Sequence, residues 1–356
     1  MKKIPKNISR IMVVFRTILL LGVIYNHTPD KYFVPNNSIQ KLIFINVNHF
    51  IMNFVICAVP VYFIMSGYLL YKEDCTYIQL VKKKIFSLMI PYFLWNVFQI
   101  VLYVSAEILP MTRKFFTDTD NDFLNMSAVN IVSYVLGVGH NDFPVNGPMW
   151  YVRDLFVLII ISPLLKKILD KYSFLIITLF LFMMYNHTRI FFLRIDGPLF
   201  LSLGYLICKH EDVVIEFIKH LNLRVVTISF SILSIMVCYL NYNEYNMLSI
   251  FSAILLYLVI ALKIQENSHM FYFFEKLSKY SFFVYGLHAS VIIVVGKIFN
   301  KIFTWDNIVF DLIGYFLLFI LSTIICYCVA YIVSSRCPKL FGLFNGMRNK
   351  YVCKVK

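Results

Sequence analysis

Charged residues are scarce in this chain. Only 15% of its 356 residues are Asp, Glu, Lys or Arg, whereas about 25% is usual in a soluble domain. Hydrophobic residues make up 60%, and the charges fall in short clusters between apolar runs. Runs of about 17–25 apolar residues are long enough to cross the hydrocarbon layer of a bilayer. The composition therefore excludes an ordinary soluble domain and predicts a chain embedded in a lipid bilayer.

Acidic groups, cysteine motifs and a signal-cleavage site are also lacking. Asp and Glu number only 19, and Asp154 alone lies well inside an apolar run, whereas a proton-coupled transporter normally needs more such groups. The eight cysteines follow no metal-ligand spacing, so we expect neither a disulfide framework nor a metal site. No small-residue cleavage site follows the apolar stretch 11–25, which predicts a retained first helix.

Ten apolar runs fill most of the chain, and the basic residues between them indicate a topology. Lys and Arg are enriched in cytoplasmic loops. With the N-terminus inside, 23 of the 33 basic residues lie in inner segments and eight in outer ones. This bias explains most of the net charge of +14 without a nucleic-acid partner. We predict an all-α bundle of about ten transmembrane helices, one membrane domain over 1–356, with both termini in the cytoplasm. The runs are 11–27, 50–71, 85–107, 149–165, 173–186, 196–208, 225–241, 248–262, 281–296 and 308–335.

The longest predicted outer segment is 108–148, an extracytoplasmic loop that contains four aspartates. Loops of this length often carry function, although a solvated connector is the alternative. Within it, 128–138 is mostly apolar but too short to span, and we expect it to lie at the membrane interface.

Arg16 and His27 are ionisable groups in the first predicted helix. They lie eleven positions apart, which at about 100° per residue is about 20° beyond three full turns and about 16 Å along the axis. Alone, Arg16 could be an arginine that snorkels to the inner interface, and His27 a polar interfacial residue. Together they form one polar stripe, which must face protein or water, because ionisable groups facing lipid are costly.

An arginine, ten residues and a histidine in the first helix resemble the acyltransferase 3 family of membrane acyltransferases. Three later segments are similar to motifs of the same family. They are VPVYFIMSGY at 59–68, NGPMWYVRDL at 146–155 with SPLL at 162–165, and LSKYSF at 277–282 followed by Tyr285 and His288. The resemblance extends from the first predicted helix to the ninth.

The resemblance implies transfer of an acyl group, usually acetyl, from cytoplasmic acyl-CoA to a hydroxyl of a sugar. We therefore expect an O-acetyltransferase in a bacterial plasma or inner membrane. Acetyl-CoA would be the donor substrate and no cofactor would be bound permanently. The acceptor would be a cell-surface or exported glycan, with glycan-export machinery as a further partner. Two alternatives stay open: a transporter or flippase for a polysaccharide or lipid-linked sugar, and a non-catalytic membrane scaffold or sensor.

The family's motifs also assign roles to residues. Arg16 would hold the donor through charge-assisted hydrogen bonds, and His27 would take the proton from the attacking hydroxyl or carry the acyl group covalently. The expected donor-binding residues are Arg16, Ser66, Lys82, Lys83, Lys84 and His288, with His288 in the inner half beside Ser66 and Gly67. The expected acceptor or cavity residues are Trp150, Arg153, Asp154 and Tyr285.

Several of these residues also have plain structural explanations. The three lysines at 82–84 fit a simple topology signal. Ser66 and Gly67 fit close helix packing, and Trp150 fits an interfacial anchor. His288 and Tyr285 lie three apart on one helix face, as a packed pair would.

Overall fold

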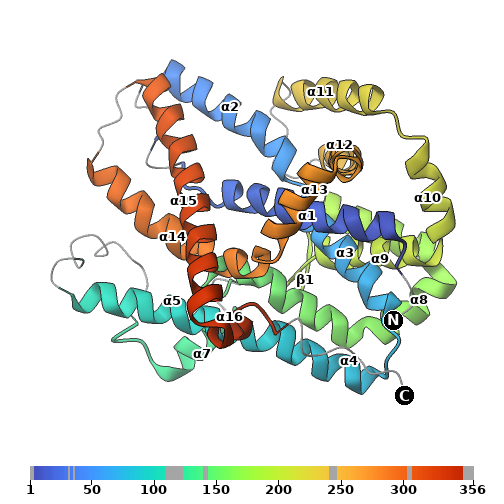
Figure 1. Cartoon of the computed structure of the whole chain (residues 1–356), viewed down its shortest axis with the longest axis horizontal. Coiled ribbons are helices and arrows are strands. Elements are labelled where there is room, and N and C mark those ends of the chain that lie inside the picture. The colour runs from blue at the N-terminus through green and yellow to red at the C-terminus, as the bar shows by residue number, and fades with distance from the viewer. Residues whose placement is uncertain are drawn as a thin grey trace.

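The structure is a computed structural model, and it describes residues 4–30, 33–34, 37–109, 112, 123–138, 143–239, 247–302 and 307–347. Helices make up nearly all of its regular structure (Figure 1). A two-residue antiparallel hairpin, β1 (Arg189–Ile190) and β2 (Leu193–Arg194), connects two of them. The predicted all-α class is therefore confirmed for the part of the chain that the structure describes.

The helices of the first half extend from α1 to α8. Side chains cap several of them: Asn37 accepts hydrogen bonds at the start of α2, and Thr76 and Gln79 form a capping box at the start of α4, satisfying backbone N–H groups that a helix start leaves open. The elements are α1 (Lys6–Asn26), α2 (Ser38–Val55), α3 (Ala58–Lys72), α4 (Tyr77–Lys84), the π-helix η1 (Ile85–Met89), α5 (Ile90–Ile108), α7 (Ala128–Leu136), the 3₁₀ turn η2 (Gly147–Met149) and α8 (Trp150–Tyr185).

The helices of the second half extend from α9 to the short α16 near the C-terminus. Asn267 and Asn307 cap α13 and α15 in the same way as Asn37 caps α2. The elements are α9 (Asp196–Lys209), α10 (Glu211–Lys219), α11 (Leu223–Tyr239), α12 (Met247–Glu266), α13 (Ser268–Ser278), α14 (Ser281–Ile302), α15 (Ile308–Arg336) and α16 (Pro338–Phe344).

Where the structure describes them, the predicted apolar runs are almost entirely helical, although run 50–71 is divided between α2 and α3 by a turn at residues 56–57. Runs 149–165 and 173–186 are the two halves of α8, which bends at Tyr172, where the backbone leaves helical geometry (φ −130°, ψ 35°). Run 50–71 begins earlier than expected, because the Asn37 cap starts the helix at Ser38. The short stretch 128–138 contains the nine-residue helix α7. Of the long segment 108–148, residues 110–111, 113–122 and 139–142 lie outside the described residues.

Six described helical segments are long and apolar enough to cross a membrane: Lys6–Asn26, Ser38–Lys72, Tyr77–Ile108, Met247–Glu266, Ser281–Lys301 and Ile308–Arg336. The remaining four predicted runs correspond to the two halves of α8, to α9 and to α11, whose apolar part Leu223–Met236 is shorter. A multi-pass membrane bundle follows from these segments. The count of ten and the cytoplasmic location of both termini stay predictions.

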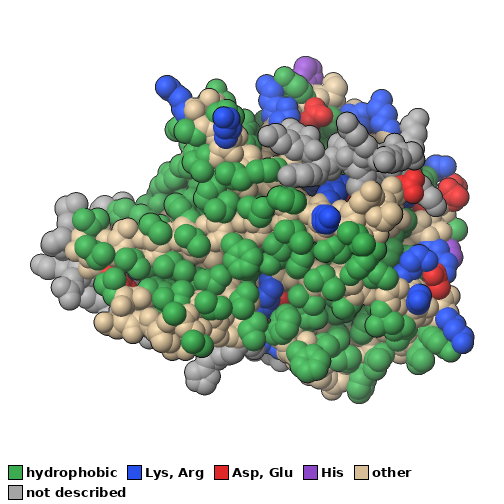
Figure 2. Space-filling model, turned by 90° about the horizontal axis from the view of Figure 1, so that it is seen from below, with side chains coloured by type: hydrophobic (Ala, Val, Ile, Leu, Met, Phe, Trp, Pro, Cys, Tyr) green, Lys and Arg blue, Asp and Glu red, His purple; other side chains and the backbone are tan. Residues whose placement is uncertain are grey.

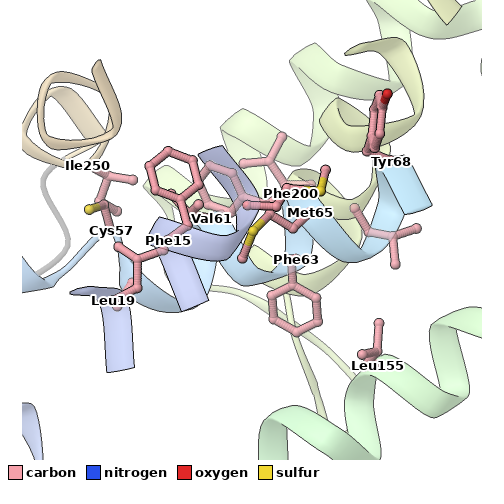
Figure 3. Close-up of a cluster of buried hydrophobic side chains, with 14 of the residues drawn as sticks. Phe15, Leu19, Cys57, Val61, Phe63, Met65, Tyr68, Leu155, Phe200 and Ile250 are labelled. Carbon is pink, nitrogen blue, oxygen red and sulfur yellow. The ribbon is translucent and has the colours of Figure 1, made fainter. Parts of the chain in front are cut away.

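The core forms where α1, α3, α8, α9 and α12 meet. Figure 3 shows Phe15 and Leu19 of α1, Val61 and Phe63 of α3 and Phe200 of α9 gathered into one cluster. Helices α3 and α9 approach closely because Gly67 faces the Leu201 carbonyl and Gly204 faces the Ile64 carbonyl, leaving no room for a Cβ on either glycine. The packing explanation for Gly67 is therefore confirmed.

An ion pair connects the end of α3 to the start of α10. Lys72 binds Glu211 at 2.7 Å, and Tyr68 donates a hydrogen bond to the same carboxylate. Burial raises the pKa of Glu211, but these hydrogen bonds outweigh it and leave the pKa below its ordinary value. Figure 2 shows charged side chains collecting toward its right-hand end, the side on which Figure 1 places α4 and α10, while hydrophobic side chains cover the broad middle of this face.

Candidate functional site

A cavity of about 420 Å³ lies among α1, α3, α4, α8 and α14. One wall is apolar, and Met65 and Leu155 belong both to it and to the hydrophobic core (Figure 3). The other walls carry cations, hydroxyls and a carboxylate. The polar lining residues are Arg16, Tyr62, Ser66, Glu73, Lys83, Lys84, Ser87, Tyr151, Ser281 and Tyr285.

Hydrogen bonds among tyrosines fix the part of the cavity around Arg16. The Tyr62 hydroxyl donates to the Arg16 carbonyl oxygen at 2.8 Å, and the Tyr151 hydroxyl donates to the Tyr62 carbonyl oxygen at 3.2 Å. The Ser66 hydroxyl lies 3.0 Å from that of Tyr151. These bonds tie α1, α3 and α8 together, so Arg16 and Ser66 line the cavity from a rigid frame.

Lysines line the cavity where α3 ends and α4 begins. Lys83 and Lys84 are lining residues, whereas Lys82 is exposed and is not among them. The Lys83 ammonium lies 2.6 Å and 2.9 Å from the two carboxylate oxygens of Glu73. Glu73, which follows the last residue of α3, is seven positions after Ser66, and this corresponds to about 10 Å along the helix. The cavity therefore extends over nearly two helical turns, with positive charge at both ends.

The C-terminal turn at 345–347 contributes to the cavity wall. Asn345 accepts a hydrogen bond from the Phe283 N–H at 3.1 Å and donates one to the Lys279 carbonyl oxygen at 3.2 Å, which fastens the turn to the start of α14. Gly346 has a φ of +79° and packs against the Ser87 carbonyl oxygen, and both Gly346 and Met347 line the cavity. Only glycine adopts such a φ without strain.

Sequence analysis did not single out Glu73 or the turn at 345–347. For Glu73, the only signal was its place in a basic segment between two apolar runs. The role of the turn depends on a contact between distant parts of the chain. Tyr62 and Tyr151 lay inside the motifs already recognised, but no role was assigned to them.

His27 and His288 face each other, with ring centroids 5.3 Å apart. His27 follows the last residue of α1, and His288 is fully buried in α14. The Nδ1 atom of His288 lies 2.6 Å from the Tyr285 carbonyl oxygen. A carbonyl only accepts hydrogen bonds, so Nδ1 carries the proton and Nε2 keeps a lone pair. Within the described residues, no hydrogen-bond partner is found for Nε2.

The structure thus places His288 beside His27 and not among the lining residues near Ser66, where the sequence predicted it. The reason is the direction of α14. Phe282 and Tyr285 line the cavity opposite Arg16, and His288 lies one turn further along, at the C-terminal end of α1. Arg16 thus shares the cavity with residues of α14, and His27 faces a residue of the same helix. His27 itself is not a lining residue of the cavity as described, so a single cavity for both stays a prediction.

Tyr285 joins the cavity to the histidine pair. Its side chain lines the cavity, its carbonyl oxygen accepts the His288 hydrogen bond, and its hydroxyl donates to the Pro148 carbonyl oxygen. Tyr285 is thus the one of the four expected acceptor or cavity residues that lines this cavity, and its role there stays a prediction.

Trp150, Arg153 and Asp154 take part in a separate network and are not among the cavity-lining residues. Arg153 donates to the Asp154 carboxylate at 2.8 Å and to the Gly137 carbonyl oxygen. The other Asp154 oxygen accepts from the Arg194 N–H at 3.4 Å, and the Arg194 guanidinium lies 4.5 Å from the centre of the Trp150 ring. These side chains fasten the β1–β2 hairpin and the end of α7 to α8, and their expected role toward the acceptor stays a prediction.

Asn146 positions the start of α8. It is fully buried, its N–H donates to Asn96 at 2.9 Å, and its side-chain amide donates to the Gly286 carbonyl oxygen at 2.9 Å. These bonds connect α5, α14 and the turn η2, which sets where Tyr151 enters the cavity. In the described ranges, no group of three His, Cys, Asp or Glu side chains is arranged to hold a metal ion.

Comparison with known proteins agrees with this geometry. A family model described as an acyltransferase domain matches residues 12–333. The chain is also similar to the succinoglycan biosynthesis protein ExoH of Rhizobium meliloti (strain 1021), with 24% identity over 173 residues. That match covers 47% of this chain and 44% of the relative, so it spans less than half of either protein. No solved structure matches.

The family match confirms the prediction made from the four motifs, because it runs from the first helix to α15 and includes Arg16, His27, Ser66, Tyr285 and His288. The chain therefore belongs to the acyltransferase 3 family of membrane enzymes that transfer acyl groups.

Proposed function

We propose that this chain is an O-acetyltransferase that moves an acetyl group from cytoplasmic acetyl-CoA to a hydroxyl of a cell-surface or exported glycan. One observation carries the proposal: a cavity with cations at both ends reaches Tyr285, whose carbonyl oxygen fixes a histidine that faces His27. Family membership supports acyl transfer. The relative named for succinoglycan biosynthesis supports a glycan as the acceptor.

The cavity suits a donor that is anionic at one end and apolar along its arm. Its volume of about 420 Å³ lies within the usual range for ligand pockets of about 300–1,000 Å³. Lys83 and Lys84 would bind the phosphates of the donor. The apolar wall would hold the pantetheine arm, and Arg16 would bind a carbonyl oxygen of that arm, so that the thioester at its end lies nearer His27.

In the proposed reaction, His27 takes the proton of the attacking hydroxyl. The hydroxyl oxygen forms a bond to the thioester carbonyl carbon, and the negative charge passes to the carbonyl oxygen. The C–S bond then breaks and the proton passes to the departing thiolate. An acetyl-His27 intermediate is the alternative route, and an acetylated His27 peptide trapped in the absence of acceptor would reveal it.

His288 would act as a positioning residue in this reaction. Its protonated Nδ1 is held by Tyr285, so its Nε2 lone pair is available to accept a hydrogen bond from the His27 ring. Such a bond would leave the other His27 nitrogen unprotonated, as a general base requires.

We place the enzyme in a bacterial plasma or inner membrane with its donor entrance on the cytoplasmic side. The support for this orientation is that 23 of 33 basic residues lie in segments predicted to be cytoplasmic. The lysines at the α4 end of the cavity belong to one of these segments.

The test is to incubate purified protein in lipid nanodiscs with radiolabelled acetyl-CoA, with and without membranes that contain glycan. We expect labelled glycan, or slow thioester hydrolysis when the acceptor is absent. His27→Ala should abolish both, whereas His220→Ala, which changes an exposed histidine on α10, should leave them intact. The proposal is refuted if the purified protein neither binds acetyl-CoA nor releases label from it, with or without the membranes that contain glycan.

A further inference from the structure

We infer that the Glu73 carboxylate competes with the phosphates of coenzyme A for Lys83 at the donor entrance. It binds Lys83 when the cavity is empty and binds it again when the product leaves. This inference rests on the proposed function, because it takes coenzyme A as the ligand of the cavity. It assigns to the Glu73 carboxylate a role in the exchange of product for a new donor molecule.

The position of Glu73 is unusual for a site that binds an anion. Glu73 is the residue that ends α3, and Lys83 lies on α4 across a short connection. Both side chains line the cavity, with exposures of 10% for Glu73 and 22% for Lys83. Among the described lining residues, Glu73 contributes the one carboxylate, beside the cations of Arg16, Lys83 and Lys84.

A carboxylate at this place opposes phosphate binding through like-charge repulsion. It also occupies the ammonium group that would otherwise meet the phosphate, with both of its oxygens in contact. A phosphate group offers Lys83 more oxygens and more charge than a carboxylate does, so it can displace Glu73 from Lys83. The displaced carboxylate stays nearby, since α3 ends at that residue.

The same arrangement favours release of the product. After acyl transfer, coenzyme A keeps all of its phosphates and loses only the acyl group, so the cationic entrance would hold product as tightly as donor. When coenzyme A leaves, Lys83 binds Glu73 again, and this ion pair compensates for the lost contact with phosphate. Glu73 would therefore lower affinity for donor and product alike and speed the exchange between them.

A second ion pair at the end of α3 provides a matched control. Lys72, next to Glu73 in the chain, binds Glu211 at 2.7 Å with exposures of 8% and 18%. Neither residue lines the cavity. If the Glu73–Lys83 pair merely fastens α4 to α3, loss of either carboxylate should affect stability and leave ligand affinity unchanged.

The experiment measures binding of coenzyme A and of pantetheine, which has no phosphate, by titration calorimetry on protein in nanodiscs. Glu73→Gln should bind coenzyme A about threefold to tenfold more tightly, as removal of one nearby like charge at a partly screened site allows, and product inhibition should increase in parallel. Pantetheine affinity should not change. Glu211→Gln should match the wild type, and adding Lys83→Met to Glu73→Gln should remove the gain.

The inference is overturned if folded Glu73→Gln binds coenzyme A with unchanged or lower affinity. Should Glu73→Gln fail to reach the membrane, Glu73→Ser makes the same comparison with a small polar group at the helix end. Absence of coenzyme A binding in the wild type would instead refute the proposed function, and the inference with it. Tighter pantetheine binding would also count against it, because that ligand carries no charge for Glu73 to repel.

Discussion

His288 donates its Nδ1 hydrogen to the carbonyl oxygen of Tyr285, one turn earlier in α14, at 2.6 Å. This bond settles which ring nitrogen carries the proton. It also connects the cavity lining to the histidine pair, because the Tyr285 side chain lines the cavity while its backbone holds His288. The consequences of this relationship can be measured residue by residue.

Replacing the two polar residues of α1 should separate chemistry from binding. His27→Ala should lower acyl transfer by about 10²–10⁴-fold, the usual contribution of a general base, and leave coenzyme A affinity nearly unchanged, since His27 is not a cavity-lining residue. Arg16→Ala should weaken donor binding. Calorimetry and a transfer assay on each variant check the division of roles. Equal loss of donor binding in both variants would show that the roles are wrongly assigned.

His288→Ala should lower kcat and leave the KM for acetyl-CoA within about twofold. The expected loss is about 10-fold to 100-fold, because a misplaced catalytic group costs rate and not ground-state affinity. Steady-state kinetics with the donor varied give both constants. A matching rise in KM would favour the donor-binding role first predicted from the sequence.

Gly346→Ala should disturb the donor cavity from the far end of the chain. A Cβ at this position would press on the Ser87 carbonyl oxygen, and the φ of +79° is strained for alanine, at about 1–3 kcal/mol. Donor affinity should fall while the protein still reaches the membrane. Gly342→Ala is the control, because a Cβ there meets nothing within 4 Å. Identical donor affinities for the two variants would remove the turn at 345–347 from the site.

The register between Arg16 and His27 should be essential. One alanine inserted after Leu20 rotates the end of α1 by about 100° and turns His27 away from His288, so transfer should be lost. The same insertion after Ile4, before the helix begins, keeps the register and should retain transfer. Activity assays need a folding check by size-exclusion chromatography on both proteins. Normal activity in a folded Leu20 variant would contradict the shared helix face.

Cysteine labelling should establish the topology. Asp122→Cys should react with an impermeant reagent from outside, and Lys83→Cys and Lys350→Cys only from the cytoplasm, because the basic residues lie mainly in segments predicted to be inside. Asp122 and Lys350 fall outside the described residues. External labelling of Lys83→Cys would invert the orientation and place the donor entrance on the wrong side for cytoplasmic acetyl-CoA.

The helices were readable from the sequence because each is an apolar run with polar residues at its ends. The boundaries of the helices were harder to predict. The Asn37 cap starts α2 at Ser38, twelve residues before the apolar run that begins at position 50. The runs 149–165 and 173–186 looked like two helices because the charged stretch 166–171 interrupts hydropathy. The structure agrees with this division, because the backbone of α8 leaves helical geometry at Tyr172, directly after that stretch.

The site was predictable only where its residues lie close in sequence or within a recognised motif. Arg16 and His27 could be paired because helical geometry relates them directly. Partners from other elements depend on tertiary packing: His288 meets His27 because α14 packs on α1, and Arg153 meets Gly137 because the end of α7 packs on α8. Spacing along one helix carries no information about which neighbour a side chain will face.

The turn at 345–347 has a consequence for biosynthesis. Arg16 leaves the ribosome well before Gly346 and Met347, which are made only after α15 and α16. The donor cavity therefore lacks one wall until translation has passed position 347 and the last helices have been inserted. A nascent chain with only its earlier helices in the bilayer would hold Arg16 and Lys83 without a closed pocket around them.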